Sequence, residues 1–215
     1  DPNKPVLTEM NFIIERGKSV AFIGKSGSGK TTLLDLFLGL IKSNQGQILF
    51  NDKFEINNDL NSWYKKVYYL PQDKFLFNDT ILNNITLDFN LSKNIRNDKS
   101  NFKKLNDAIQ LSRLDKFINE LPDGLETIIG ERGVTISGGQ RQRLVLARAL
   151  FHDRDILVLD EATSSLDNDL EDEINKSVNS LKGNKTIILI THNLNLTKFC
   201  DHIYKLENSK VTKIK

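Results

Sequence analysis

Disulfides and long apolar runs are both missing from this sequence. Cys200 is the single cysteine among 215 residues, so an internal disulfide is excluded and a reducing compartment is the natural expectation. Its surroundings are mostly apolar, where a free thiol usually packs as a small hydrophobic side chain. No stretch approaches the roughly 20 apolar residues that a membrane-spanning helix needs. The opening residues DPNKPVLTEMNF have neither a basic leader nor an apolar core, so we expect no signal peptide there.

A strong charge of either sign is absent as well. The 30 basic and 28 acidic side chains give a formal net charge of +2. This imbalance is too small to indicate binding to nucleic acid or to an anionic membrane surface. The content of 39% hydrophobic and 27% charged residues fits a globular protein. The length allows one substantial core with an inserted subdomain, and no nucleic-acid partner is expected.

Short apolar runs rich in β-branched residues alternate with amphipathic segments, which predicts an α/β fold. Buried strands are predicted at 19–24 (SVAFIG), 155–160 (DILVLD) and 186–192 (TIILITH). The run that starts at Lys30 is a predicted helix over 30–40, because four apolar residues share one of its faces. A second helix is predicted between the last two strands, where Leu170, Ile174, Val178 and Leu181 recur at helical spacing. The last residues predict a hairpin that turns near 207–209.

The middle of the chain has a different character. Strand signals fade from about Asp73 to Arg143, and helical patterns occupy 102–121. Asn, Lys and Asp crowd 88–101, which we interpret as a solvated loop. We therefore predict a mostly helical subdomain at 73–143, inserted into an α/β core formed by 1–72 and 144–215.

A glycine-rich segment follows the first strand. Residues 24–31 (GKSGSGKT) match the pattern G-x-x-x-x-G-K-[ST] between a strand and a helix, the context that this phosphate-binding pattern requires. The glycines let the backbone curl so that N–H groups face phosphate oxygens, and the helix start adds positive potential. Lys30 would reach the β- and γ-phosphates and the Thr31 hydroxyl would bind Mg²⁺. The alternative, a flexible loop with a surface lysine, is disfavoured by this context. The predicted nucleotide-binding residues here are Gly24, Lys25, Ser26, Gly27, Ser28, Gly29, Lys30, Thr31 and Thr32.

Two further strands end in polar residues. Asp160 closes an apolar strand and Glu161 follows it. The first carboxylate can hold Mg²⁺ through water and the second can orient and deprotonate an attacking water, although such a pair can also simply cap a helix. His192 ends the next strand, where it could contact the γ-phosphate or support Glu161.

Residues 136–150 (ISGGQRQRLVLARAL) place Ser137, Gly138, Gly139 and Gln140 at the start of a helix. This is a second anion-binding helix start, and one nucleotide does not need both. Two copies arranged head to tail would resolve this, each supplying its second site to the nucleotide of the other. We interpret Arg141, Arg143 and Arg148 as residues for solvent contacts and structural ion pairs.

With these motifs in this order, the chain resembles the nucleotide-binding domain of ABC transporters over nearly its whole length. The segment 24–31 corresponds to Walker A, Gln72 in YYLPQD to the Q-loop, and 137–140 to the signature. Asp160 and Glu161 correspond to Walker B, Asp167 to the D-loop and His192 to the switch histidine. The resemblance implies a P-loop core with a mainly parallel sheet, an antiparallel β portion and an inserted helical subdomain.

The resemblance also implies an activity and its residues. It implies an ATPase that uses ATP and Mg²⁺, with Glu161 as general base and Lys30, Gln72 and His192 as further catalytic residues. Thr31, Gln72 and Asp160 would hold the metal, and Asp167 would communicate across a dimer. The implied partners are a second nucleotide-binding domain, identical in the simplest case, and a transmembrane domain at the cytoplasmic face of the cell membrane.

The subtype resembles exporter-type cassettes, commonly fused behind six transmembrane helices. The similarity lies in 75–85 (FLFNDTILNNI) and 121–133 (LPDGLETIIGERG), of which 130–133 lies close to intracellular loops in that family. Phe75 and Phe77 would line the groove for a coupling helix, or be ordinary core aromatics. The main alternative is a soluble ATPase subunit of an importer. A chromosome-maintenance ATPase is disfavoured because heptads are absent, and a small-molecule kinase because it has no need for 137–140.

Two departures from the family pattern stand out. Ile136 replaces the usual Leu, a change between aliphatic side chains of similar volume. The family's adenine-stacking aromatic residue precedes a segment like DPNKPVL, so we expect it upstream of Asp1 in a longer polypeptide. Tyr64, Tyr68 and Tyr69 are poor substitutes for it. Without this stacking, ATP binding would weaken by roughly 5- to 150-fold.

Overall fold

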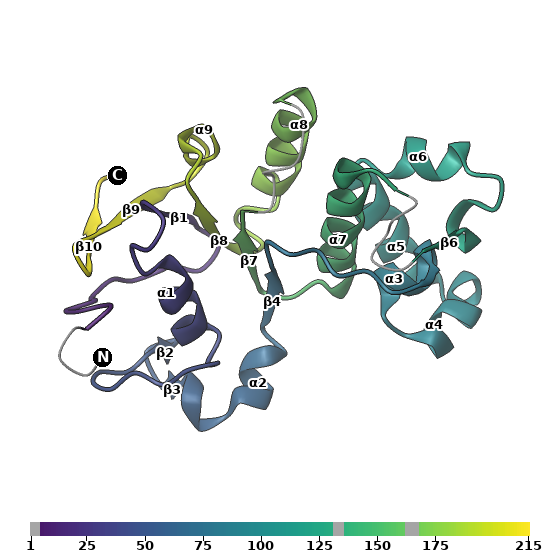
Figure 1. The fold of residues 1–215 in the computed structure, drawn as a ribbon. Helices are drawn as coiled ribbons and strands as arrows, with labels where there is room; N and C mark the ends of the chain where they lie inside the picture. The colour runs from purple at the N-terminus through teal and green to yellow at the C-terminus, as the bar shows by residue number, and fades with distance from the viewer. Residues whose placement is uncertain (1–4, 131–135, 162–167) are drawn as a thin grey trace. The chain divides into compact units, whose positions relative to one another are not determined.

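The structure is a computed structural model that describes residues 5–130, 136–161 and 168–215, apart from the side chains of 92 and 168–170 (Figure 1). Contacts divide the chain into two compact units. Unit 1 comprises Asp1–Tyr68, Arg154–Asp160 and Lys182–Lys215, and unit 2 comprises Tyr69–Asp153 and Glu161–Leu181. The domain boundaries at 72/73 and 143/144 stay a prediction. Within the described ranges, no helix combines the length and the apolar character needed to cross a bilayer.

A six-stranded sheet forms the centre of the α/β fold, with strand order β10-β9-β1-β8-β7-β4. β1 runs parallel to both β8 and β9, and β7 runs parallel to β8, whereas β10 is antiparallel to β9. Every residue of β1 and β8 is buried, as expected for central strands of a parallel sheet. The strands are β1 (Ser19–Ile23), β4 (Val67–Leu70), β7 (Ile156–Asp160), β8 (Thr186–Thr191), β9 (His202–Glu207) and β10 (Lys210–Lys213).

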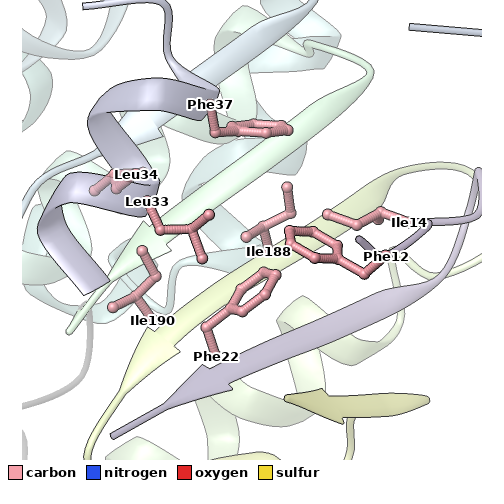
Figure 2. Close-up of a pocket in the computed structure, with 8 residues that line it drawn as sticks. All are labelled: Phe12, Ile14, Phe22, Leu33, Leu34, Phe37, Ile188 and Ile190. Atoms are coloured by element: carbon pink, nitrogen blue, oxygen red, sulfur yellow. The ribbon is translucent and has the colours of Figure 1, made fainter. Parts of the chain in front are cut away.

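The remaining elements of unit 1 surround these strands. They are α1 (Lys30–Phe37), α2 (Leu60–Tyr64), α9 (Leu194–Thr197), and the paired short strands β2 (Leu49–Phe50) and β3 (Phe54–Glu55). The α1 residues Leu33 and Leu34 are buried and border an apolar hollow that is lined by β1 and β8 (Figure 2). Its lining is hydrocarbon alone, which makes it a packing feature of the core rather than a site for a polar ligand.

Unit 2 is mainly helical. α7 packs against α3 and α5 (Figure 1). α5 also contacts α8. A short antiparallel pair, β5 with β6, lies beside α3. The elements are β5 (Asp79–Thr80), α3 (Ile81–Thr86), α4 (Phe89–Asn94), α5 (Lys99–Leu111), α6 (Asp115–Glu120), β6 (Ile128–Ile129), α7 (Gly138–His152) and α8 (Asn168–Asn179).

The prediction of a loop at 88–101 is wrong, because α4 and the start of α5 occupy this segment. Asp88 and Asp98 are N-caps whose carboxylates accept hydrogen bonds from backbone N–H groups two and three residues later, at 2.9 to 3.1 Å. Residues that are poor in helix interiors are good at helix starts, so the polar composition marks two helix starts rather than a loop.

The α/β fold class, with a mainly parallel sheet and helices, is confirmed. The three predicted buried strands are β1, β7 and β8, and the predicted helix over 30–40 is α1, which ends earlier at Phe37. The predicted hairpin is also present. β9 and β10 are joined through Asn208 and Ser209, which have φ of 51° and 62°. Positive φ at both central residues is the geometry of a tight two-residue hairpin turn.

Candidate nucleotide-binding site

The loop of residues 24–29 leaves the carboxyl end of β1 and leads into α1. A Cβ on Gly24 would lie 2.5 Å from Ser28 Oγ and 2.7 Å from the carbonyl oxygen of Leu206, so only glycine fits there. Gly27 and Gly29 have φ of 77° and 98°, a region that side-chain-bearing residues rarely adopt. The glycine spacing is therefore explained by one steric and two conformational requirements.

Lys30, the first residue of α1, folds back over this loop. Its Nζ donates hydrogen bonds to the carbonyl oxygens of Gly24 at 2.7 Å and Lys25 at 3.0 Å. An ammonium group has three donors, so one remains for a phosphate oxygen. The bonds place the positive charge at the loop itself rather than in solvent.

The start of α1 has no side-chain cap. Gly29 occupies the N-cap position and makes no side-chain hydrogen bond, and the first turn contains no acidic residue. The backbone N–H groups at a helix start need acceptors and carry partial positive charge. A phosphate group would satisfy both needs.

Two other predicted residues lie at the same edge of the sheet. Ile23 is in register with Thr191, and Asp160 with Ile190, so β1, β8 and β7 end together. Asp160 is the last residue of β7, and His192 directly follows β8 and is exposed. β8 lies between β1 and β7, which places the loop and Asp160 two strand spacings apart, about 10 Å. Unit 1 thus brings Gly24, Asp160 and His192 to one edge.

A phosphate group and Mg²⁺ fit the residues of unit 1. Ser28 Oγ is buried at the loop without a hydrogen-bond partner among the described residues, and Lys30 supplies a positive charge. Thr31 is exposed on the first turn of α1, and Asp160 is half-buried. Mg²⁺ is usually held in proteins by one or two oxygen side chains together with substrate phosphates, which matches the predicted hydroxyl and carboxylate.

In unit 2, Gln72 and Glu161 are joined although 89 residues separate them. Gln72 Nε2 donates to Glu161 Oε2 at 2.9 Å. Glu161 has φ of 48°, the left-handed conformation that costs a residue with a side chain about 1–2 kcal/mol. Such strain is often found at functional sites. Both side chains are partly or fully accessible to solvent, as a site for water attack requires.

The second predicted helix start is the beginning of α7. Ser137 is the N-cap, and its Oγ accepts a hydrogen bond from the Gln140 N–H at 3.1 Å. The Gln140 Oε1 in turn accepts from the Ser137 N–H at 2.8 Å, which completes a capping box. Gly138 and Gly139 form the first turn between these two residues.

Two groups of residues complete the comparison with the sequence. Asp167 and residues 131–133, which carry predicted features, lie outside the described residues. Lys74, next to the Q-loop segment, has a lowered pKa that the sequence did not predict. Its pKa is lowered by burial and by the nearby Arg141 charge, against the opposing effect of Asp73. A lone lysine beside an aspartate gives no signal of this kind in a sequence.

Comparison with known proteins assigns these features to a family. Residues 7–164 match the family model described as ABC transporter. The ATP-dependent lipid A-core flippase of Blochmanniella pennsylvanica is 40% identical over 212 residues, covering 98% of this chain and 35% of the relative. The heavy metal tolerance protein of Schizosaccharomyces pombe is 37% identical over 211 residues, covering 98% of this chain and 24% of the relative.

A solved structure of a bacterial Atm1-family ABC exporter with ATP bound has a TM-score of 0.87 and 32% identity, over 99% of this chain and 36% of that chain. The chain spans about a third of the length of the flippases that it matches. These similarities favour the exporter type over the importer alternative. The family model covers most of the chain, and the structural likeness extends over nearly all of it, so the chain belongs to the ABC transporter family.

Proposed function

We propose that this chain is the ATP-binding and ATP-hydrolysing domain of an ABC exporter. The observation that carries the proposal is the edge of the sheet in unit 1, where the Gly24–Gly29 loop, Lys30, Asp160 and His192 come together. A motif match alone indicates a nucleoside triphosphate. The similarity to ATP-dependent flippases and to an exporter with ATP bound supports ATP as the nucleotide.

The predicted residues have distinct roles in this proposal. The loop N–H groups and Lys30 would bind the phosphates. Thr31, Asp160 and Gln72 would hold Mg²⁺, which would supply positive charge to neutralise the phosphates. Glu161 accepts a proton from the attacking water as general base, with Gln72 holding its carboxylate at 2.9 Å. His192 contacts the γ-phosphate from the end of β8.

The domain works as a head-to-tail dimer in this proposal. The start of α7 supplies Ser137, Gly138, Gly139 and Gln140 to the nucleotide bound by the second copy. Binding of two MgATP molecules closes the dimer and hydrolysis opens it, which powers movement of a cargo across the membrane. The domain would be attached to transmembrane helices at the cytoplasmic face of the cell membrane.

Phe75 and Phe77 are the proposed attachment point for the membrane domain. The two residues are 55% and 45% exposed, and their rings meet edge to face at 5.0 Å between centroids, so they are not core side chains. Leu76 between them is 1% exposed and anchors the segment. Exposed aromatic pairs on an anchored backbone are typical of protein contact surfaces.

The test replaces the proposed base. Glu161→Gln keeps the size of the side chain and its hydrogen-bonding oxygen but removes the carboxylate, so turnover should fall by about 100- to 10,000-fold while MgATP binding persists. Glu120→Gln, an identical change at the exposed end of α6, should leave turnover unchanged. Parental turnover in Glu161→Gln would contradict the assignment of the base.

The same variant tests the dimer. Light scattering of Glu161→Gln should report a monomer without nucleotide and a dimer with MgATP, because ATP that is not hydrolysed keeps the two copies closed. A monomer that has bound MgATP in a parallel titration would contradict head-to-tail dimerisation of identical chains.

A further inference from the structure

The exposed Phe75–Phe77 turn is held in place by one buried asparagine. Asn84, on α3, is fully buried. Its Oδ1 accepts a hydrogen bond from the Phe77 N–H at 2.9 Å, and its Nδ2 donates to the Phe77 carbonyl at 3.0 Å. The side-chain amide therefore pairs with Phe77 as a neighbouring strand would. Nδ2 also donates to the Thr80 carbonyl at 3.0 Å, which fixes the far end of the turn.

Arg148, on α7, also forms hydrogen bonds with this turn. Its side chain is buried, with 7% of the residue exposed. Nη1 donates to the Phe75 carbonyl at 3.0 Å, Nε to the Asn84 carbonyl at 2.6 Å and Nη2 to Asn84 Oδ1 at 3.1 Å. Three donors of one planar guanidinium thus hold the turn and the residue that orders it. We call Arg148 and Asn84 the buried clamp.

The chemistry of the clamp is specific to its two residues. A guanidinium presents several N–H donors in a rigid plane, whereas a lysine ammonium is a single point on a flexible chain and cannot meet all three acceptors. Aspartate in place of Asn84 would lose the donor, and leucine would lose both donor and acceptor. A charged group is costly to bury unless it is well hydrogen-bonded, so such a network adds more to geometric precision than to stability.

The helix that carries Arg148 is also the helix that begins with the signature. Arg148 lies ten residues after Gly138, or about 15 Å along α7. α7 packs on α3 and α5, and every residue of 144–149 is buried. A packed helix moves as a rigid element, so a displacement at one end is carried to the other.

We propose that Arg148 and Asn84 are positioning residues, which fasten the Phe75–Phe77 turn to α7 so that movement of the turn moves the Ser137–Gln140 helix start. This inference rests on the proposed function, because it takes the turn as the contact with the membrane domain. The clamp touches neither nucleotide nor water in this scheme. It acts only by transmitting position.

The experiment compares ATPase rates of the complete polypeptide that carries this chain, reconstituted in lipid nanodiscs, with MgATP binding by the chain alone. Arg148→Lys keeps the positive charge but removes the planar guanidinium with its three engaged donors. The matched control is Arg154→Lys, since Arg154 also donates to a backbone carbonyl, that of Lys65 at 3.0 Å, and neither residue belongs to the turn or to a proposed binding site. The turn itself is altered in the double variant Phe75→Ala/Phe77→Ala.

Arg148→Lys and the turn variant should each lower the ATPase rate in nanodiscs by about 2- to 30-fold, a typical range for coupling residues, while MgATP affinity of the chain alone stays at the parental value. Combining them should cause no further loss, because both break the same connection. Arg154→Lys should retain the parental rate. Non-additivity distinguishes transmission through the turn from a general weakening of the fold, which would multiply the two losses.

Three results would overturn the clamp: a parental rate in Arg148→Lys, an effect that multiplies with that of the turn variant, or a turn variant without effect. Failure of the parent chain to bind or hydrolyse MgATP would contradict the proposed function itself. Circular dichroism verifies folding. If Arg148→Lys does not fold, Asn84→Ser replaces it in the same cycle, because it removes the amide that orders the turn while keeping a small polar side chain.

Discussion

Glycine and serine residues lie at the starts of both α1 and α7, yet the two starts differ in how many of their backbone N–H groups are already hydrogen-bonded. At α1 the N-cap is Gly29, which has no side chain to accept from the first turn. At α7 the N-cap is Ser137, and its hydroxyl and the Gln140 amide form a closed capping box. The first start leaves its backbone N–H groups available to an external acceptor such as an anion. The second has already satisfied two backbone N–H groups with its own side chains.

The difference indicates how the two starts would meet a phosphate. α1 adds Lys30 across its loop and can hold the anion without rearrangement. At α7 the side-chain bonds engage the N–H groups of Ser137 and Gln140, so the glycine N–H groups between them would be used first. We infer that the α1 start binds the nucleotide first. The α7 start then adds contacts to a nucleotide that is already bound.

Among the changes that test this comparison, the largest expected effect comes from adding a side chain at Gly24 in the loop before α1. Gly24→Ala would place a Cβ against Ser28 Oγ and the Leu206 carbonyl, and the second of these is backbone that cannot move aside. We expect MgATP affinity to fall by roughly 5- to 150-fold, measured by calorimetric titration.

The control for that change lies three residues away. A methyl group on Gly27 would meet no atom within 4 Å, and only the φ of 77° at this residue is unfavourable to alanine. Gly27→Ala should cost about 1 kcal/mol of stability and lower affinity less than Gly24→Ala does. Equal losses in the two variants would mean that loop flexibility, rather than close packing, limits binding.

A smaller effect, on stability rather than on MgATP affinity, is expected for a change beside the start of β1. Asp201 accepts hydrogen bonds from Ser19 N–H at 2.8 Å and Ser19 Oγ at 2.9 Å. Burial raises the pKa of this carboxyl, but these bonds and Lys182 outweigh it and hold the pKa below its usual value. Asp201→Asn should reduce the free energy of unfolding by about 1–2 kcal/mol at pH 7, measured by urea denaturation.

The pH dependence of that difference follows from the sign of the shift. A carboxyl with a lowered folded pKa adds stability that is fully present above its unfolded pKa, near 4, and is lost as pH falls through the folded value. The gap between parent and Asp201→Asn should therefore stay constant above about pH 5 and narrow below about pH 4. A gap that widens in acid would show that the lowered pKa is not the cause.

At α7 the expected effect is smaller again. Ser137→Ala removes the cap and should lower the free energy of unfolding by about 1 kcal/mol in urea denaturation. Ser100→Ala, an exposed serine in the first turn of α5 that is not the N-cap, should change stability by less than about 0.5 kcal/mol. MgATP affinity of the monomer should be unchanged in both. A loss of monomer affinity in Ser137→Ala would contradict the division of roles between the two helix starts.

The smallest expected effect concerns Cys200, in the core of unit 1. Burial raises the pKa of its thiol to about 11, so almost no thiolate exists near neutral pH. Alkylation by iodoacetamide should be slow in the folded protein, unaffected by MgATP, and fast in urea, as followed by mass spectrometry. Rapid alkylation of the folded chain would show that this region opens more often than its burial suggests.

Sequence predicts best where the chemistry depends on neighbouring residues. The loop of residues 24–31 is predictable because steric and conformational needs fall on fixed positions between a strand and a helix. The buried strands are predictable from their apolar runs. The prediction for 88–101 is wrong because Asp and Asn are common both in loops and at helix starts, and composition alone does not separate the two.

Residues that act through distant partners could not be predicted. The hydrogen bond between Gln72 and Glu161 crosses 89 residues of chain, and no local pattern encodes it. In the sequence, Arg148 is one of three similar helix arginines that suit solvent contacts and ion pairs. Its bonds to Asn84 and Phe75 depend on how α7 packs on α3, which is a tertiary property.

The left-handed backbone of Glu161 also restricts which residues evolution can place there. β-Branched residues are nearly excluded by sterics at φ of 48°, whereas Gly, Asn and Asp enter that region most easily. The residue at this position must therefore meet two requirements. It must tolerate a positive φ, and it must carry a carboxylate on a side chain of sufficient length. Glutamate meets the second requirement against the preference of the first, so a drift to glycine or asparagine would relax the backbone and remove the carboxylate. Degenerate copies of this domain should accumulate those two residues here.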